Sequence, residues 1–222
     1  MAFIRPYKET DFAACANICI ATLPPSLSSS PEAARLLPYL WTHQYTLLPP
    51  STSHVLDDGS DAAVGYCIVC PDVFAFVSAY PRYTTSILAR DVAKPAQLAT
   101  REPWTITSTS VMGESIVNPV ALAQLAYRAD RILLEGKKAL TSRWRATMHI
   151  DLLGPWQGKG WGRQLIERFV QSVRESGADY DEGEHIGIAG ENAKVVRFYE
   201  NVGFRVSEGG EEEGSIWMVR KT

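Results

Sequence analysis

A glycine-rich segment, Gln157-Gly-Lys-Gly-Trp-Gly-Arg163, carries the clearest chemical signal in the sequence. It follows an apolar stretch and precedes an amphipathic one, so we expect it to join a strand to the first turn of a helix. Glycines at alternate positions leave backbone N–H groups facing outward at the positive end of the helix dipole. Gln157 adds an amide donor, and Lys159 and Arg163 add positive charge. This combination is typical of a phosphate-binding turn.

The spacing of these glycines excludes two common nucleotide-binding motifs. The pattern Gly-x-x-x-x-Gly-Lys-[Ser/Thr] of nucleoside triphosphatases is absent. The dinucleotide pattern Gly-x-Gly-x-x-Gly is not matched either, because the spacing here is Gly-x-Gly-x-Gly. A tight strand-to-helix turn that binds nothing stays open as the alternative.

A second segment of interest, Asn192–Phe204, is predicted to be a helix with a tyrosine on its packing face. Asn192 is a suitable N-cap, and Gly203 is a suitable helix stop. An ordinary amphipathic helix is the simplest interpretation of this stretch. The phenol of Tyr199, with an ordinary pKa near 10, is also a competent general acid.

The elements that must position these residues form an alternating series in the last third of the chain. We expect a strand over Arg145–Leu153, a helix over Gln157–Ser176, a strand over Glu184–Ala189, a helix over Asn192–Val202, and a hairpin of Phe204–Val206 with Ser215–Arg220. A strand–helix–strand order implies two neighbouring parallel strands.

The first part of the chain is expected to supply antiparallel strands and helices. The predicted elements are a strand at Ala2–Tyr7, helices opening at Thr10-Asp11 and over Glu32–Tyr45, and a hairpin of Ser53–Leu56 with Ala62–Cys70. In the middle we expect helices over Thr84–Ala93 and Val120–Leu140. We interpret residues 1–222 as a single α/β domain in which about 71–141 is an insertion over the sheet.

Composition excludes several classes of protein. The 222 residues are 45% hydrophobic and 21% charged, which argues against wholesale disorder. A net charge of -3 gives no electrostatic footprint for nucleic acid. Charges at Arg5, Lys8, Glu9 and Asp11 interrupt any signal peptide, and no apolar run is long enough for a membrane span. We expect a cytoplasmic protein, with a nuclear location as the alternative, that is a monomer or homodimer and has no nucleic-acid or membrane partner.

The four cysteines offer a possible zinc site. Cys15 and Cys19 are four residues apart on a predicted helix, and Cys67 and Cys70 form a CxxC. The second pair lies in an apolar, β-branched run, where residues three apart point to opposite faces of a sheet. We therefore predict core packing and no metal.

Taken together, the two motifs resemble those of the GNAT superfamily of acetyl-CoA-dependent N-acetyltransferases. The [Gln/Arg]-x-x-Gly-x-[Gly/Ala] loop of that family is matched by Gln157, Gly160 and Gly162, and its later helix pattern is matched by Asn192, Tyr199, Gly203 and Phe204. Ile4–Tyr7, Asp72–Phe76 and His149–Leu153 are similar to the acetyltransferase-like domain of O-GlcNAcases and its free-standing bacterial and fungal relatives. This narrower resemblance spans nearly the whole chain and is thin over roughly 77–140.

The resemblance implies a GNAT fold, with a mixed, mostly antiparallel sheet, two splayed parallel strands and helices on both faces. It implies acetyl-CoA or coenzyme A as the cofactor, with the pantetheine arm between the splayed strands. The cofactor-binding residues would be Ile150, Asp151, Leu152, Leu153, Gln157, Gly158, Lys159, Gly160, Trp161, Gly162, Arg163, Asn192, Phe198 and Tyr199. The amine would attack the acetyl carbon directly, without an acyl-enzyme.

Two proton transfers then need side chains. The resemblance favours Tyr199 as the acid, and it leaves Asp151, His149 and His185 open as the base. His149 and Asp151 share a strand face, and a carboxylate beside an imidazole raises its basicity. His185 could also contact the acceptor. Asp72 has two equally weighted roles: its charge could neutralise a cationic substrate, or its carboxylate could cap a local turn. Glu184 is a weaker candidate for the base, and we interpret it as a surface charge.

The function expected from this resemblance is an acyltransferase that acetylates a primary amine, with a small molecule such as an amino sugar or polyamine as acceptor. One alternative is a protein lysine or N-terminus as the acceptor. Another is a catalytically inactive, CoA-binding pseudo-acetyltransferase, since some animal relatives have lost the loop that Gln157–Arg163 retains.

Overall fold

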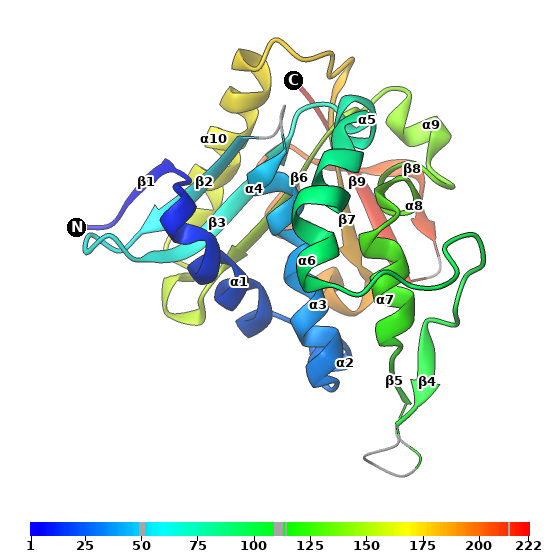
Figure 1. Ribbon diagram of the computed structural model, residues 1–222. Helices are drawn as coiled ribbons and strands as arrows, with labels where there is room; N and C mark the ends of the chain where they lie inside the picture. Colours follow the sequence, from blue (N-terminus) through cyan, green and yellow to red (C-terminus); the bar gives the residue numbers. More distant parts are fainter. Residues whose placement is uncertain (49–51, 109–112, 114, 213) are drawn as a thin grey trace.

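The computed structural model describes residues 1–48, 52–108, 113, 115–212 and 214–222, and its centre is a mixed β-sheet (Figure 1). Seven strands of the described chain lie in the order β1-β2-β3-β6-β7-β9-β8. They are β1 (Phe3–Pro6), β2 (Thr52–Asp57), β3 (Ala63–Cys70), β6 (Ala146–Leu152), β7 (Gly183–Ala189), β8 (Arg205–Glu212) and β9 (Ser215–Lys221). Only β6 and β7 pair in parallel, and the other neighbours are antiparallel. The predicted mixed sheet with two parallel strands is confirmed.

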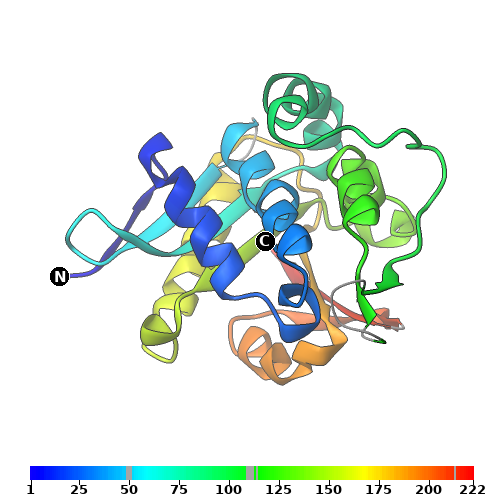
Figure 2. The ribbon, with the colours of Figure 1, turned by 60° about the horizontal axis from the view of Figure 1, so that its bottom comes forward.

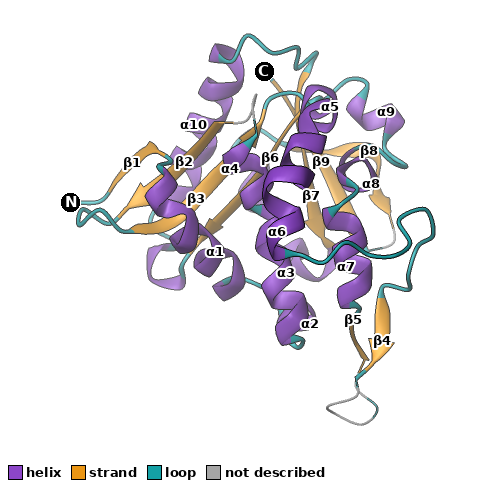
Figure 3. Cartoon of the chain, viewed as in Figure 1, coloured by secondary structure: helices purple, strands orange, loops and turns teal. Residues whose placement is uncertain are grey.

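Helices cover both faces of this sheet, as Figures 2 and 3 show. One face carries α1 (Phe12–Ala21), α3 (Pro31–Trp41), α4 (His43–Leu47), α5 (Val73–Tyr83) and α7 (Pro119–Ala126), and the other carries α10 (Trp161–Glu175). The shorter helical elements are η1 (Glu9–Asp11), α2 (Pro25–Ser28), η2 (Thr84–Leu88), α6 (Ala89–Asp91), α8 (Ala129–Leu133), α9 (Lys138–Thr141), η3 (Gly154–Trp156), η4 (Gly190–Val195) and α11 (Val196–Glu200). A small hairpin, β4 (Thr105–Thr107) with β5 (Ser115–Val117), projects from the body (Figure 1). Among the described residues, none of the helices combines the length and the apolar character needed to span a bilayer.

Alternation along β3 divides its side chains between two cores. Tyr66, Ile68 and Cys70 pack against the helices on the sheet face that carries α1. Cys67 and Val69 pack against α10 on the other face. The predicted opposite orientation of Cys67 and Cys70 is thus confirmed. Cys15 and Cys19 lie in the first core, and burial raises the pKa of each of these two thiols to about 12. The cysteines fill core space.

Three of the predicted helices have different bounds in the structure. The middle helix begins at Val73, not Thr84, because the Asp72 carboxylate accepts a hydrogen bond from the Phe74 N–H at 2.9 Å; it then passes into η2 and α6. The expected helix over Glu32–Tyr45 breaks at Thr42, whose backbone leaves the helical region (φ -122°, ψ -67°).

The single helix expected over Val120–Leu140 is instead three short ones, α7, α8 and α9. Arg128 has a non-helical backbone (φ -134°, ψ 68°), and its guanidinium bonds Asp130 at the start of α8. Gly136 has φ +76° and separates α8 from α9. Apolar periodicity ran across both breaks, which is why the sequence pattern suggested one helix.

A buried ion cluster connects β1 to the hairpin of β2 and β3. The Arg5 guanidinium donates from Nε to Asp57 at 2.7 Å and from both terminal nitrogens to Asp11 at 2.6 and 2.9 Å. Burial opposes the ionisation of Asp11, but hydrogen bonds from Arg5 and from the Lys8 N–H outweigh it and lower the pKa of Asp11. The hydrogen bond from Arg5 is also the main reason why the pKa of Asp57 is lowered.

This cluster predicts a loss of stability in acid. Carboxyl groups with a lowered pKa in the folded state stabilise it above their unfolded pKa of about 4, and they lose that contribution as the pH falls through the folded pKa. In Asp11→Asn, the free energy of unfolding in urea should therefore fall less between about pH 5 and pH 3 than in the wild type. Asp91→Asn, on the exposed helix α6, is the control, and its free energy of unfolding should depend on pH as that of the wild type does. The same pH dependence in Asp11→Asn would contradict the prediction.

Candidate active site

The two parallel strands separate shortly after they meet. Ladder pairing between β6 and β7 covers only Ala146 with Glu184 and Thr147 with His185. Beyond that point β6 stays paired with β3 as far as Leu152, and β7 stays paired with β9. Within the described chain, the edge of β6 from Met148 onward therefore has no strand beside it. Backbone N–H and C=O groups on such an edge are available to an extended ligand.

The glycine turn lies just past the end of that open edge. Gly158 and Gly160 have φ of +69° and +84°, a region that side chains disfavour, and a Cβ at either position would meet no atom within 4 Å. Gly160 immediately precedes α10. Within the described residues, the backbone N–H groups from Gly158 to Arg163 have no hydrogen-bond acceptor. The glycines are thus required by backbone conformation and leave open space over unsatisfied donors, which fits a pyrophosphate group.

The two charged side chains of the turn are exposed, whereas the Gln157 amide is already hydrogen-bonded within the chain. Lys159 and Arg163 are exposed, and the Lys159 ammonium lies 5.6 Å from the centre of the Trp156 ring. The amide of Gln157 instead donates to the backbone oxygen of Leu152 at 2.7 Å. In this structure Gln157 therefore braces the turn against the end of β6 and does not face outward as a donor.

Helix α11 lies across the first turn of α10. A Cβ on Gly162 would come within 3.1 Å of the Phe198 ring, so the glycine permits this close approach. Phe198 is 38% exposed, and Tyr199 packs edge-on against it and against Phe204. Burial, with smaller contributions from Cys67 and Asp151, raises the pKa of Tyr199. The phenol thus holds its proton at neutral pH.

The predicted cap of this second motif is wrong, whereas its stop is confirmed. Asn192 is an exposed residue inside η4 with a non-helical backbone (φ -106°, ψ 19°), and Val195 precedes α11. Gly203 has φ +94°, and the Phe204 N–H closes the end of the helix on the Tyr199 oxygen at 3.0 Å.

His149 and Asp151 do come together on one face of β6, around a residue that sequence reasoning missed. The Tyr66 hydroxyl on β3 donates to Asp151 Oδ2 at 2.6 Å and lies 3.1 Å from His149 Nδ1. His149 Nε2 is 3.8 Å from Asp151 Oδ2. The ring of Trp41, at the end of α3, lies 5.7 Å from the imidazole. Burial, followed by the Asp151 charge, raises the pKa of Tyr66, so this hydroxyl stays a donor.

This geometry fixes which nitrogen of the His149 imidazole carries the proton. Because the single proton of the Tyr66 hydroxyl goes to Asp151, its oxygen is left to accept from Nδ1–H of His149. Nε2 then carries the free lone pair.

The remaining candidates lie apart from this network. His185 is 2% exposed, and its Nδ1 lies 2.6 Å from the Trp144 carbonyl oxygen; burial lowers its pKa to about 4. Asp72 caps α5, which matches the capping role that we weighed for it. The prediction that Glu184 is a surface charge is wrong. Glu184 is 0% exposed, because it lies on β7 in the middle of the sheet, paired with Ala146 of β6. Burial raises the pKa of its carboxyl group.

The fold corresponds to that of known acetyltransferase structures. SsHAT superposes with a TM-score of 0.76 and 26% identity over 99% of this chain and 98% of its own. A GNAT-family acetyltransferase from Staphylococcus aureus Mu50 gives a TM-score of 0.51 with 8% identity, over 100% and 99% of the two chains. The yncA structure from Salmonella typhimurium, solved with its cofactor acetyl-CoA, gives 0.50 with 14% identity, over 98% and 91%. No protein-family model matches the sequence.

The chain therefore has the GNAT acetyltransferase fold, as its two motifs predicted.

Proposed function

We propose that this chain is an acetyl-CoA-dependent N-acetyltransferase that acts on the primary amine of a small molecule, such as an amino sugar or a polyamine. The observation that carries this proposal is the separation of β6 from β7 after two residue pairs. It leaves an open strand edge that leads straight to the glycine turn, so a long ligand with a phosphate end can be held along its whole length.

The residues present fit the cofactor. The backbone of Ile150–Leu152 would hold the pantetheine arm along the open edge, and the N–H groups of Gly158–Arg163 would hold the pyrophosphate. Leu153, expected to share this role, is already bonded through its N–H to Val64 and through its oxygen to Trp156. Phe198 and Tyr199 would flank the arm from α11. Bound acetyl-CoA supplies the acetyl group as an activated thioester.

The protein residues then manage protons. An amine acceptor arrives as an ammonium ion and must lose a proton, and His149 Nε2 is the group that accepts it. Tyr66 accepts a hydrogen bond from Nδ1–H and so orients the ring, and its own hydroxyl proton is donated to Asp151. Tyr199, whose pKa is raised by burial, retains its proton at neutral pH and can donate it as the general acid.

Direct transfer is supported by the state of the cysteines. Cys67, the cysteine on the sheet beside Met148, is fully buried, and burial raises the pKa of its thiol. A thiol that does not ionise is a poor nucleophile, so an acyl-enzyme on Cys67 is disfavoured.

The substrate class can be tested by thiol release with acetyl-CoA and a panel of glucosamine, spermidine and a lysine-containing peptide. We expect kcat/KM for a small amine to exceed that for the peptide by at least about tenfold, a difference of about 1.4 kcal/mol in transition-state binding. Faster turnover of the peptide would replace the proposal with a protein acetyltransferase. Acetyl-CoA binding without thiol release for any amine would leave a pseudo-acetyltransferase.

A further inference from the structure

Trp41 lies beside the proposed base and has no part in the function proposed above. It is the last residue of α3, which ends there because the Thr42 backbone leaves the helical region (φ -122°, ψ -67°). The Trp41 ring lies 5.7 Å from the His149 imidazole, at an interplanar angle of 39°. The Tyr66 ring is also 5.7 Å from that imidazole. Of these two neighbours, Tyr66 is occupied by its hydrogen bonds within the site, whereas Trp41 is not.

The indole N–H of Trp41 is an unpaired donor. Trp41 is partly buried and packs against the core on the α1 face of the sheet. Among the described residues its Nε1–H has no hydrogen-bond acceptor, and the nitrogen itself is not fully buried. The donor is therefore open to a ligand next to His149. An indole N–H can only donate, so the ligand that pairs with it must bring an acceptor atom.

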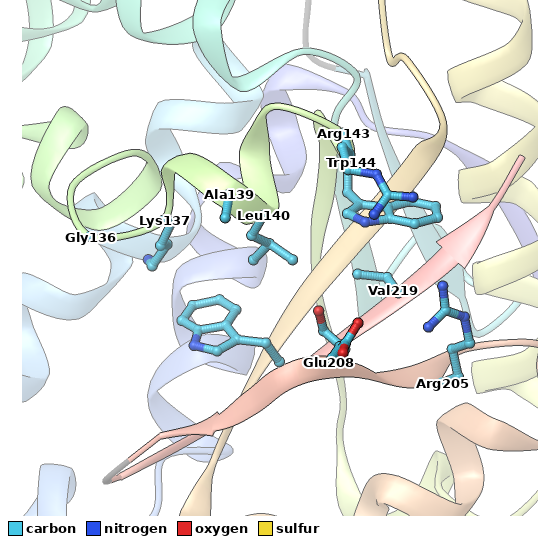
Figure 4. Close-up of a pocket in the computed structure, with 11 residues that line it drawn as sticks. Gly136, Lys137, Ala139, Leu140, Arg143, Trp144, Arg205, Glu208 and Val219 are labelled. Atoms are coloured by element: carbon cyan, nitrogen blue, oxygen red, sulfur yellow. The ribbon is translucent and has the colours of Figure 1, made fainter.

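Trp144 shows a different arrangement, because protein groups already occupy its surroundings. It is 5% exposed in the pocket between α9 and the strands β8 and β9 (Figure 4). The guanidinium groups of Arg143 and Arg205 lie 5.7 and 5.9 Å from the centre of its ring. In the described part of the chain no basic side chain lies over Trp41 in this way. The exposed part of the Trp41 ring is thus available to an acceptor molecule.

Negative charge at the proposed base is limited to one carboxylate. Asp151 Oδ2 lies 3.8 Å from His149 Nε2 and already accepts a hydrogen bond from Tyr66 at 2.6 Å. Within the described residues no other carboxylate lies within 4 Å of the imidazole nitrogens. A polyamine carries two or more ammonium groups, and an ammonium group only donates hydrogen bonds. A polyamine would therefore bring several charges to a single carboxylate and would offer no acceptor to the Trp41 N–H.

We propose that Trp41 binds the acceptor and that the acceptor is an amino sugar, an inference that rests on the function proposed above. A hydroxyl of the sugar accepts the hydrogen bond from Nε1–H of Trp41, and the C–H face of the sugar ring lies on the exposed part of the indole. The amino group of the sugar then reaches Nε2 of His149. One amine, several hydroxyl acceptors and an apolar ring face satisfy each of these protein groups together.

The variant Trp41→Phe tests the contact, because it keeps an aromatic ring next to His149 and removes the N–H. Steady-state thiol release with acetyl-CoA should give a KM for glucosamine that is about three- to tenfold higher, the effect of one lost hydrogen bond. Its kcat and the pH profile of kcat should match the wild type, because His149 is intact. The KM for cyclohexylamine, which has a ring and one amine but no hydroxyl, should not change. Each acceptor is compared with itself in the wild type, so differences in amine basicity cancel.

Trp104→Phe is the matched control. Trp104 is 47% exposed and directly precedes the separate hairpin of β4 and β5, so this variant should keep the wild-type KM for glucosamine. An unchanged KM for glucosamine in folded Trp41→Phe, or an equal rise for cyclohexylamine, would overturn the inference. A wild-type kcat/KM that is higher for spermidine than for glucosamine would also overturn it. Each of these outcomes leaves the acetyltransferase proposal in place.

Binding without turnover separates the two proposals. Calorimetric titration with glucosamine uses the full chain saturated with coenzyme A, and we expect saturable binding that is about three- to tenfold weaker in Trp41→Phe. That result with no thiol release for any amine would overturn the acetyltransferase proposal and leave the sugar site at Trp41 standing. No saturable binding of glucosamine, with thiol release for another amine, would overturn the inference alone.

Discussion

Gly160→Trp should reduce acetyl-CoA binding by at least about 100-fold, because an indole would fill the space over the free N–H groups of the turn. At least two hydrogen bonds to phosphate would be lost, and each bond to a charged group contributes about 1.5–3 kcal/mol. Isothermal titration of the wild type and the variant with acetyl-CoA measures the effect. Thiol release would fall in parallel, since the cofactor would no longer be held.

Gly177→Trp is a closely matched control. Gly177 follows the last turn of the same helix, has φ +66°, and also has no atom within 4 Å of a Cβ placed on it. The two substitutions therefore impose a similar backbone strain and a similar exposed indole at opposite ends of α10. Wild-type binding in Gly177→Trp with lost binding in Gly160→Trp assigns the effect to the turn. Wild-type binding in a folded Gly160→Trp variant would remove the turn from the cofactor site, and no binding to the folded wild type would remove the enzyme proposal.

His149→Ala should lower kcat by about 10²- to 10⁴-fold, the usual contribution of a positioned general base. The loss should shrink as the pH rises, because the acceptor is then already deprotonated. Below the pKa of an alkyl amine, near 10, the neutral fraction grows about tenfold per pH unit. Steady-state thiol release between about pH 7 and pH 10 measures both effects.

The control for this variant is His54→Ala. His54 lies on β2 opposite Cys67, on the sheet face away from His149, and it has no part in the proposed site. It should keep the kcat of the wild type. A pH profile of His149→Ala that runs parallel to that of the wild type, at any reduced rate, would assign His149 a structural role and leave Asp151 as the candidate base.

Local patterns in the sequence were sufficient to predict the parts of the site that depend on short-range geometry. The turn at Gly158–Gly162 follows from backbone conformation alone, and alternation on a strand predicted that His149 and Asp151 share a face. Gly203 ended its helix for the same local reason, its positive φ. Each of these depends on neighbours within a few residues.

The features that were missed depend on the register between distant strands. Tyr66 reaches Asp151 only because β3 pairs with β6 in a register that sets these residues opposite each other, 85 positions apart in the chain. Glu184 is buried because β7 occupies the middle of the sheet, with its side chain facing the core. Neither register nor strand order can be read from periodicity, which reports only which face a residue takes.

The short junction between β6 and β7 also divides the sheet mechanically. Two residue pairs join the plate of β1, β2, β3 and β6 to the plate of β7, β9 and β8. Further backbone bonds brace the near end: the Glu182 N–H donates to the Arg143 oxygen at 2.9 Å, and Trp144 forms a β-bridge with Asp181. At the other end the two strands part, and the contacts there are made by side chains: Phe198 of α11 lies against Gly162 of α10, and Ser26 donates to Glu191 at 2.7 Å. A ligand hydrogen-bonded to the open edges of β6 and β7 would therefore join the two plates by backbone bonds along the length where the strands part.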